Sequence, residues 1–299
     1  MNGNILCATA GWTDPTLTKG TAFYPKTARA AQDRLAHYSQ HFPLVEVDAT
    51  YYALLPVTNA YNWLQWTPPL FIFNIKAHPV LTGHPIEVAR LPSDLRQAIE
   101  DSDAGSRVYA DRLPEAIAQE LEQRFYGFLE PLLTQQRLGA LMLQFPPWFT
   151  ATKGNAQRIE SLAERWRDVP LAVEFRHASW NETERRKRVL DLLKAHDIAL
   201  VCTDEPQHGE SAADLHQVTS SRLAIVRFHG RNAQGWAKKR ASVHERFSYL
   251  YAEDELSRWV PVVRQLATEA KAVHAIFNNC YRDYAVLNAK NLAALLTRS

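Results

Sequence analysis

Short apolar runs recur along the chain and alternate with longer segments of helical period. Eight runs have the length of a buried strand: Ile5–Ala10, Leu44–Asp48, Phe71–Lys76, Ala140–Phe145, Leu171–Arg176, Ile198–Thr203, Leu223–His229 and His274–Asn279. Strands that alternate with helices pair in parallel through right-handed crossovers. Eight such units in 299 residues predict an α/β fold, a (β/α)8 TIM barrel that spans residues 1–299 as a single domain. An open doubly wound sheet is the alternative, but no Gly-x-Gly-x-x-Gly motif follows the first strand.

Two connections are too long to be simple links between a strand and a helix. They are Pro79–Pro114, after the third strand, and Gly230–Asp254, after the seventh. Both leave the C-terminal ends of strands, the face at which barrel enzymes carry their active sites. Loops of this length are commonly lids or binding loops. We therefore predict a long insertion after strand 3, which allows an irregular barrel, and we expect it to form a mobile cover over a site.

The alternation within the strands predicts a polar pocket. Successive side chains of a strand point to opposite faces of the sheet. In six strands one face ends in polar or charged residues while the other face is apolar. The residues of the polar face are Glu46 with Asp48, Asn74 with Lys76, Met142 with Gln144, Glu174 with Arg176, Arg227 with His229, and Ile276 with Asn278. Because a packed barrel interior uses branched aliphatic residues, we expect these side chains to meet in a pocket at the C-terminal ends of the strands.

The charges of this pocket favour a small anionic substrate, bearing phosphate or carboxylate and resembling a sugar or a nucleotide. An arginine beside a carboxyl group lowers its pKa by about 1–3 units, so Glu174 is predicted to be ionised and to act as a base or an orienting group. The planar guanidinium fork suits phosphate and carboxylate groups, and we expect Arg176 and Arg227 to bind them. Internal ion pairing with Glu46 and Glu174 is the alternative for both arginines.

Roles follow from the residue types. Glu174, His229 and Lys76 are the predicted catalytic residues: His229 titrates near neutral pH in water, and Lys76 stabilises negative charge. A hydrogen-bonded core histidine is the alternative for His229. Tyr52 and Trp180 follow strands at the rim and are expected to stack on a sugar or base, with packing under the loops as the alternative. The predicted substrate-binding residues are Glu46, Asp48, Tyr52, Gln144, Arg176, Trp180, Arg227 and Asn278.

Metal-dependent and nucleic-acid-binding functions are alternatives to a metal-independent enzyme. No His-x-His or His-Glu-x-x-His motif occurs, and three cations share the pocket with the carboxylates, so no metal or other cofactor is predicted. A metal-dependent phosphodiester hydrolase or sugar isomerase remains an alternative. The net charge of +2 argues neither for nor against nucleic acid. A non-catalytic nucleotide or nucleic-acid-binding module, using the pocket and the basic residues Lys238, Lys239 and Arg240, is a further alternative.

Nothing in the chain suggests a membrane partner. No apolar run approaches about 18 residues, and the first residues lack a basic stretch followed by an apolar one. The three cysteines, Cys7, Cys202 and Cys280, are widely spaced and predict neither disulfides nor a zinc site. A cytoplasmic protein is expected.

Several motifs of the chain resemble a bacterial family known as domain of unknown function 72. They are Gly11-Trp12 with Phe23-Tyr24-Pro25, the segments 45–52, 73–77, 143–147, 173–177 with Ser179-Trp180, 227–231 and 247–251, and Phe277-Asn278-Asn279. The resemblance implies a TIM barrel but no reaction. The family usually reads Glu-x-Asn with a later Phe-Tyr after strand 2, whereas this chain has Asp48 and Tyr51-Tyr52. Asp48 thus adds a carboxylate to the pocket.

Overall fold

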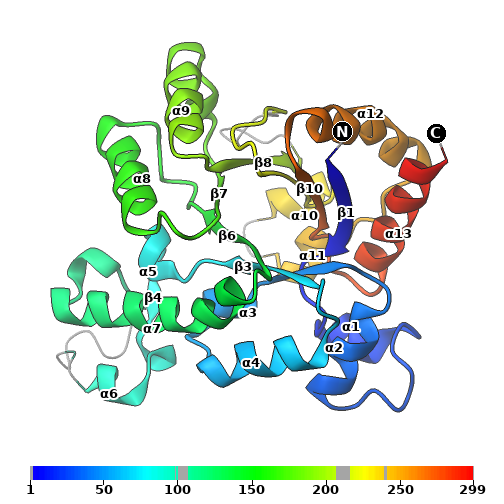
Figure 1. Cartoon of the computed structure of the whole chain (residues 1–299), viewed down its shortest axis with the longest axis horizontal. Helices are drawn as coiled ribbons and strands as arrows, with labels where there is room; N and C mark the ends of the chain where they lie inside the picture. The colour runs from blue at the N-terminus through cyan, green and yellow to red at the C-terminus, as the bar shows by residue number, and fades with distance from the viewer. Residues whose placement is uncertain (1–2, 98, 100–106, 207–215, 239–240, 299) are drawn as a thin grey trace.

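Eight parallel strands form a nearly closed barrel at the centre of the computed structural model, which describes residues 3–97, 99, 107–206, 216–238 and 241–298 (Figure 1). The strands are β1 (Asn4–Thr9), β2 (Leu44–Val47), β3 (Ile72–Lys76), β6 (Leu138–Gln144), β7 (Leu171–Glu174), β8 (Ala199–Asp204), β9 (Leu223–Phe228) and β10 (Ala272–Phe277). They pair in the order β1-β10-β9-β8-β7-β6-β3-β2. Each strand overlaps a run predicted from the sequence, so the predicted TIM barrel is confirmed.

The ring is uneven. Strands β1, β10 and β9 pair along six consecutive positions, whereas β7 and β8 pair only at Ala172–Ala199 and Val173–Leu200. The seam between β1 and β2 is closed by an isolated bridge from Ala10 to Glu46. The backbone N–H of Gly11 also donates to the carbonyl oxygen of Glu46, at 2.7 Å. Glu46 therefore lies at the seam, where its backbone ties the two ends of the sheet together.

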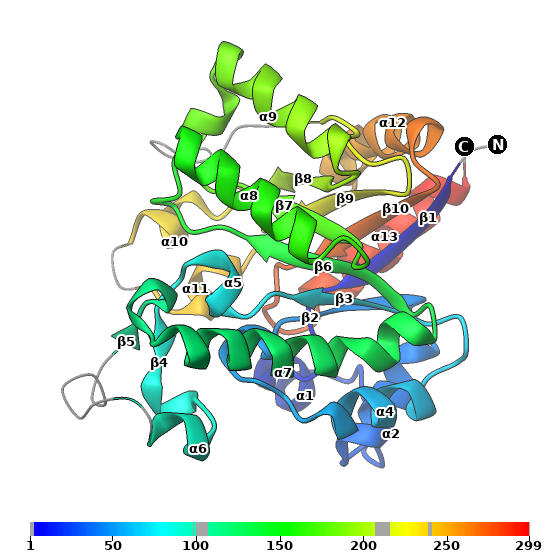
Figure 2. The ribbon, with the colours of Figure 1, turned by 60° about the vertical axis from the view of Figure 1, so that its left-hand side comes forward.

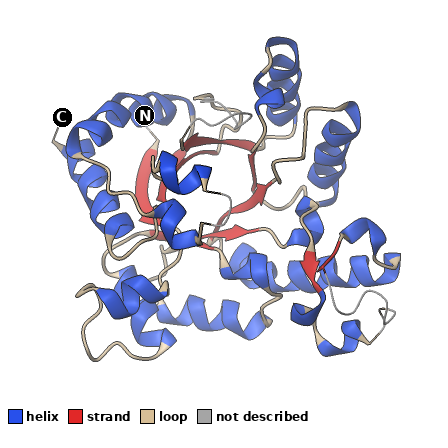
Figure 3. Cartoon of the chain, turned by 180° about the vertical axis from the view of Figure 1, so that it is seen from behind, coloured by secondary structure: helices blue, strands red, loops and turns tan. Residues whose placement is uncertain are grey.

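Helices surround the ring of strands (Figure 3). They are α1 (Pro15–Gly20), α2 (Ala31–Ser39), α3 (Ala49–Tyr52), α4 (Val57–Trp66), α7 (Glu115–Thr134), α8 (Lys153–Arg165), α9 (Thr183–Ala195), α12 (Glu253–Glu269) and α13 (Tyr284–Thr297), with a 3-10 turn, η3 (Ala178–Asn181), before α9. Ile117 and Leu121 lie on the buried, apolar face of α7. The outward residues of the strands, such as Val173 and Phe228, are buried. Packing between the strands and these helices forms most of the hydrophobic core.

The insertion after β3 extends to one side of the barrel (Figure 2). It contains α5 (Pro79–Thr82), β4 (Ile86–Glu87), η1 (Val88–Arg90), α6 (Ser93–Arg96), β5 (Arg107–Val108) and η2 (Ala110–Arg112). Strands β4 and β5 form a small antiparallel sheet. Residues 98 and 100–106 lie outside the described residues, so a mobile cover in this part of the insertion remains a prediction.

The long connection after β9 lies over the C-terminal end of the barrel. It forms two short helices, α10 (Ala233–Ala237) and α11 (Val243–Phe247). Within the described residues, no helix has the length and apolar character needed to cross a membrane. The two helices cover the end of the barrel at which the charged residues gather.

Candidate functional site

A buried arginine connects four strands at the C-terminal end of the barrel. Arg227 of β9 is 1% exposed. Its Nη1 donates to the carboxylate of Glu174 on β7 and to Oε1 of Gln144 on β6, the latter at 3.2 Å. Its Nη2 donates to Oε1 of Glu46 on β2, at 2.5 Å. The alternation of side chains in the strands predicted that these residues share one face, and the structure brings them into direct contact. Arg227 thus forms the internal ion pairs that were the alternative to anion binding.

The two carboxyl groups that share Arg227 have different electrostatic surroundings. Burial raises the pKa of Glu46 to about 7; Arg227 opposes this rise, and the nearby Asp48 adds to it. Burial also acts to raise the pKa of Glu174, but Arg176 and Arg227 together hold it well below the usual range. The second oxygen of Glu46, Oε2, is buried and has no hydrogen-bond partner among the described residues. Glu174 is thus ionised, as predicted, whereas Glu46 gains or loses its proton near neutral pH.

A second arginine lies above the first and is partly open to solvent. Arg176, which follows β7, places its Nε against Oε1 of Glu174. Its Nη1 donates to Oε2 of Glu205 at 2.5 Å, and its Nη2 lies 3.1 Å from Nε2 of His229. The side chain of Arg176 is 11% exposed. The carboxylate of Glu174 therefore lies between the guanidiniums of Arg176 and Arg227, which were predicted to bind a substrate anion.

His229 is a neutral hydrogen-bonding residue in this cluster. Burial and the charge of Arg176 lower its pKa to about 3, so the expectation that it titrates near neutral pH is wrong. A guanidinium only donates hydrogen bonds, so Nε2 of His229 accepts from Arg176. The other ring nitrogen, Nδ1, lies 2.9 Å from the side-chain amide of Asn278. His229 thus holds Arg176 in place between Glu174 and Glu205.

Lys76 and Asp48 form the more open part of the cluster. Nζ of Lys76 lies 3.8 Å from Oδ1 of Asp48, and their side chains are 13% and 30% exposed. The same nitrogen lies 4.7 Å from the centre of the Tyr51 ring. This ion pair is longer than those of the two arginines, so Lys76 is the cation of the cluster that an incoming anion can most readily bind.

Aromatic residues of the covering helices complete the enclosure. The rings of Trp236 on α10 and Phe247 on α11 lie 6.4 Å and 6.1 Å from the His229 ring. The guanidinium of Arg176 lies 5.8 Å from the Trp236 ring. The indole Nε1 of Trp236 is buried and lacks a hydrogen-bond partner in the described part of the chain. Glu46 and Trp236 thus both leave a buried polar atom unsatisfied near this end of the barrel, which is costly unless another group binds there.

The two rim aromatics predicted to contact substrate lie in different surroundings. Tyr52 is exposed, and the guanidinium of Arg90 lies 5.4 Å from the centre of its ring. Trp180 is buried on the outward side of β7, where its ring stacks on Phe175 at 4.4 Å. Its Nε1 donates to the carbonyl oxygen of Phe149, at 2.6 Å. Trp180 is therefore a packing residue. Its ring lies with Phe175 on the outward side of the sheet, so it is separated from the charged cluster on the inward side.

Three residues of the site were not predicted from the sequence. Glu205 lies two positions beyond Thr203, at which the predicted strand ended, so one further step of the same alternation would have found it. Trp236 and Phe247 lie in a connection without strand periodicity, and no local pattern identified them. Lys239 and Arg240 of the predicted basic segment lie outside the described residues. Lys238 pairs with Glu245 at 2.5 Å and is exposed.

The arrangement offers no obvious set of metal ligands. Among the residues that the structure describes, no three His, Cys, Asp or Glu side chains are grouped so that they can hold a metal ion. The central carboxylates of Glu46, Glu174 and Glu205 each bind a guanidinium instead.

The fold and the charged cluster together define a TIM-barrel protein with a polar cluster at the C-terminal ends of its strands. The family model described as "Protein of unknown function DUF72" matches residues 6–299, and the chain belongs to this family, which confirms the resemblance noted in the sequence. The chain is 33% identical over 297 residues to the UPF0759 protein YunF of Bacillus subtilis (strain 168), with 98% of this chain and 94% of YunF covered.

Solved structures agree with this membership. A DUF72 family protein from Enterococcus faecalis V583 has a TM-score of 0.79 and 27% identity, with 99% of this chain and 96% of that chain covered. A DUF72 family protein from Thermotoga maritima MSB8 has a TM-score of 0.75 and 28% identity, with 99% and 100% covered. These similarities establish the fold and the family, and none of the names states a reaction.

Proposed function

We propose that the chain is an enzyme that catalyses proton transfer, without a metal, in a small anionic substrate bound at the C-terminal end of the barrel. The observation that carries the proposal is that the carboxyl groups of Glu46 and Glu174 both bind the guanidinium of Arg227. Two carboxyl groups whose surroundings move their pKa values apart are the usual arrangement of a general acid–base site. Hydrolysis and isomerisation both require a general acid or base. Phosphate monoesters, sugar phosphates, nucleotides and small carboxylates fit the proposed class of anionic substrate.

Each residue then has a defined role. Glu46 donates or accepts the proton, because its pKa of about 7 makes both forms available near neutral pH. Glu174 stays ionised and, with Arg227, fixes the orientation of the Glu46 carboxyl group. Lys76 binds the anionic group of the substrate, since its ion pair with Asp48 is long and partly exposed. His229 acts by positioning Arg176 and carries no proton in the reaction.

The internal cancellation of charge supports a metal-independent reaction. Arg176, Arg227 and Lys76 balance Glu174, Glu205 and Asp48, and Glu46 adds a negative charge only when it is ionised. A divalent cation would have to displace a guanidinium to reach Glu174, whose two oxygens both contact arginines, and this disfavours metal binding.

The test is a turnover assay with EDTA-treated protein. The compounds tested are sugar monophosphates, nucleoside monophosphates, phosphate monoesters and small carboxylic acids. Proton and phosphorus NMR measure the consumption of each compound. We expect one class to be consumed, and Glu46→Gln to slow this by about a hundredfold or more, the usual contribution of a general acid or base. Glu122→Gln is the matched control, because Glu122 on α7 also has a raised pKa but lies away from the cluster.

Three outcomes would overturn the proposal. Full activity of Glu46→Gln would remove the proton-transfer role. Activity that is lost in EDTA and restored by zinc, manganese or magnesium would favour the metal-dependent alternative. Consumption of none of these compounds would contradict the substrate class.

A further inference from the structure

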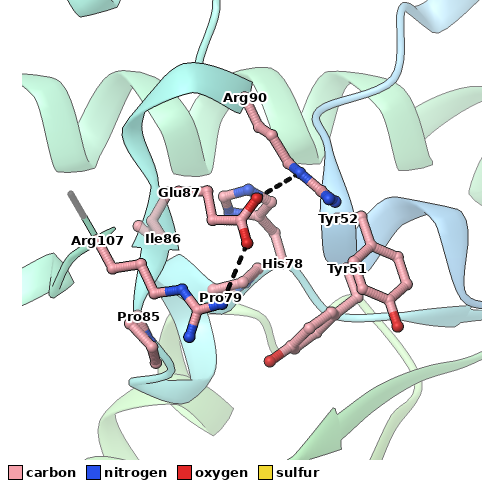
Figure 4. A pocket seen from close by; sticks show the side chains of 9 residues that line it. All are labelled: Tyr51, Tyr52, His78, Pro79, Pro85, Ile86, Glu87, Arg90 and Arg107. Carbon is pink, nitrogen blue, oxygen red and sulfur yellow. Dashed lines mark hydrogen bonds and ion pairs between the residues drawn. The ribbon is translucent and has the colours of Figure 1, made fainter. Parts of the chain in front are cut away.

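A cavity outside the charged cluster lies between the insertion and the short helix α3, which follows β2. Its volume is about 170 Å³. Its lining residues, which define the insertion cavity, are Tyr51, Tyr52, His78, Pro79, Pro85, Ile86, Glu87, Arg90 and Arg107 (Figure 4). An engineered protein cavity of about 150 Å³ is known to hold benzene, so this space accommodates a single ring.

Apolar and aromatic groups form much of the wall. Pro79, Pro85 and Ile86 come from the insertion, and Ile86 is only 3% exposed. Tyr51 and Tyr52 face them with their rings nearly perpendicular, 86° apart, and their centroids at 5.2 Å. Perpendicular tyrosines present both a ring face and a ring edge, which are the two contacts that another aromatic ring prefers.

The rim of the insertion cavity carries two guanidiniums beside one carboxylate. Nε of Arg90 lies 2.6 Å from Oε2 of Glu87, and Nη2 of Arg107 lies 3.3 Å from Oε1 of the same residue (Figure 4). Two guanidiniums therefore share one carboxylate. Within the described residues, the terminal nitrogens of Arg90 have no hydrogen-bond partner. They form a fork suited to a phosphate or carboxylate group.

A neutral donor lies in the wall beside this charge. Nδ1 of His78 accepts a hydrogen bond from the backbone N–H of Val80 at 3.4 Å, so the ring proton resides on Nε2. Burial lowers the pKa of His78 to about 4, which keeps the ring neutral near pH 7. The insertion cavity thus combines apolar walls, a neutral N–H donor and, on Arg90, a guanidinium whose terminal nitrogens have no hydrogen-bond partner among the described residues.

We propose that the insertion cavity binds a single-ring aromatic anion, with the ring against Tyr52 and the anionic group on Arg90. Phosphate and carboxylate share the recognised chemistry, which is a group of two or three oxygens that carries negative charge and is separated from the ring by one or two atoms. An inorganic anion leaves the apolar wall unused, and a neutral phenol leaves the guanidinium unused. The site is distinct from the proton-transfer site, although Lys76 contacts the Tyr51 ring and places the two side by side.

Isothermal titration of the purified protein tests the proposal with phenyl phosphate, benzoate, phenol and inorganic phosphate. We expect phenyl phosphate or benzoate to bind at least fivefold more tightly than phenol and inorganic phosphate. Arg90→Met and Tyr52→Leu should each weaken that binding at least fivefold. Both side chains are substantially exposed, so these variants should fold. Arg258→Met is the matched control, because Arg258 is also exposed and pairs with Asp254 within its own helix.

The outcome separates this proposal from the proposed function. Glu46→Gln should leave the affinity for phenyl phosphate unchanged, whether or not Glu46 is catalytic. Equal affinities in Arg90→Met and Arg258→Met would overturn the proposal. So would inorganic phosphate binding as tightly as both ring anions, or no binding of either ring anion. A loss of binding in Glu46→Gln with none in Arg90→Met would place the ligand at the charged cluster instead.

Discussion

Glu46 and Glu174 bind the two terminal nitrogens of the same buried guanidinium, that of Arg227, yet their pKa values move in opposite directions. The difference lies in their other neighbours. Glu174 also contacts Arg176, whose charge stabilises the ionised form. Glu46 has the negative Asp48 nearby, which disfavours ionisation. The two carboxyl groups therefore differ in charge state near neutral pH.

This difference predicts two separate titrations. Carbon NMR of protein labelled at the glutamate side-chain carboxyl should detect one buried carboxyl that titrates near pH 7, and Glu46→Gln should remove it. The signal of Glu174 should stay that of a carboxylate from pH 8 down to below pH 4.5, because its pKa is held well below that value. A Glu46 signal that titrates near pH 4.5 would show that solvent or an ion compensates its burial.

The same pKa of Glu46 affects stability in a defined direction. It is raised from 4.5 to about 7, so the folded protein binds more protons than the unfolded chain between these values. The resulting stabilisation is complete below about pH 4.5 and is lost as pH rises through about 7. Glu46→Gln should therefore gain stability relative to the wild type as pH increases from 5 to 8, measured by urea unfolding. A difference that is constant across this range would contradict the raised pKa.

Removing the shared guanidinium should be costly. Arg227→Met leaves the carboxyl groups of Glu46 and Glu174 buried without that partner. Breaking a buried ion pair from one side costs about 3–5 kcal/mol, and urea unfolding at pH 7 should detect a loss of this size. Arg222→Met is the control, because Arg222 makes a similar pair with Asp197 but is 55% exposed; it should cost about 1 kcal/mol or less. Equal losses in both variants would mean that burial of Arg227 contributes nothing.

Four buried histidines predict a steep loss of stability in mild acid. Burial lowers the pKa from 6.5 to about 4 for His78, His84 and His274, and to about 3 for His229. Between these values the unfolded chain binds more protons than the folded protein. The stability that these groups contribute is complete above about pH 6.5 and is lost as pH falls toward about 4.

Urea unfolding at pH 7, 6 and 5 measures this effect. The unfolding free energy should fall with each step, since the histidines outnumber the opposing contribution of Glu46. His274→Gln should reduce the slope while keeping a polar group beside Asn74. An unfolding free energy that does not change from pH 7 to pH 5 would show that these histidines are protonated in the folded protein.

The sequence predicted the barrel and most of the cluster because both depend on short-range periodicity. The apolar outward face and the polar inward face of each strand follow from the alternation of side chains. This alone placed Glu46, Glu174 and Arg227 on one face, although Glu46 and Arg227 are 181 positions apart. Strands β4 and β5 were not predicted, since each has two residues and no detectable period.

Pairing and charge state could not be predicted in the same way. Which carboxylate binds which arginine depends on the closure of the barrel, and the pKa of His229 depends on its burial by residues distant in the sequence. Trp180 follows a strand end but packs on the outward Phe175, so position along the chain did not reveal its side of the sheet. These properties follow from three-dimensional packing, which no local pattern encodes.

A glycine inside the barrel gives a last test of how closely its polar interior is packed. Gly139 lies on β6 beside the hydrogen bond between His274 and Asn74, whose Nδ1 and Oδ1 atoms are 3.1 Å apart. A Cβ at this position would lie 2.5 Å from Oδ1 of Asn74 and 2.9 Å from Cε1 of His274. Both neighbours are buried, so neither can move away freely. Gly139→Ala should lower the unfolding free energy by about 1–3 kcal/mol, the usual cost of overpacking a core.

The control for Gly139→Ala is the same substitution where space is open. Gly127 lies in the middle of α7, and no atom lies within 4 Å of a Cβ built there, outside its own helical turns and among the described residues. Alanine is preferred over glycine in helices, so Gly127→Ala should raise the unfolding free energy by about 0.5–1 kcal/mol. Urea unfolding of both variants at pH 7 measures the contrast. A Gly139→Ala protein as stable as the wild type would show that the His274–Asn74 pair rearranges at little cost, and that this layer of the barrel is not closely packed.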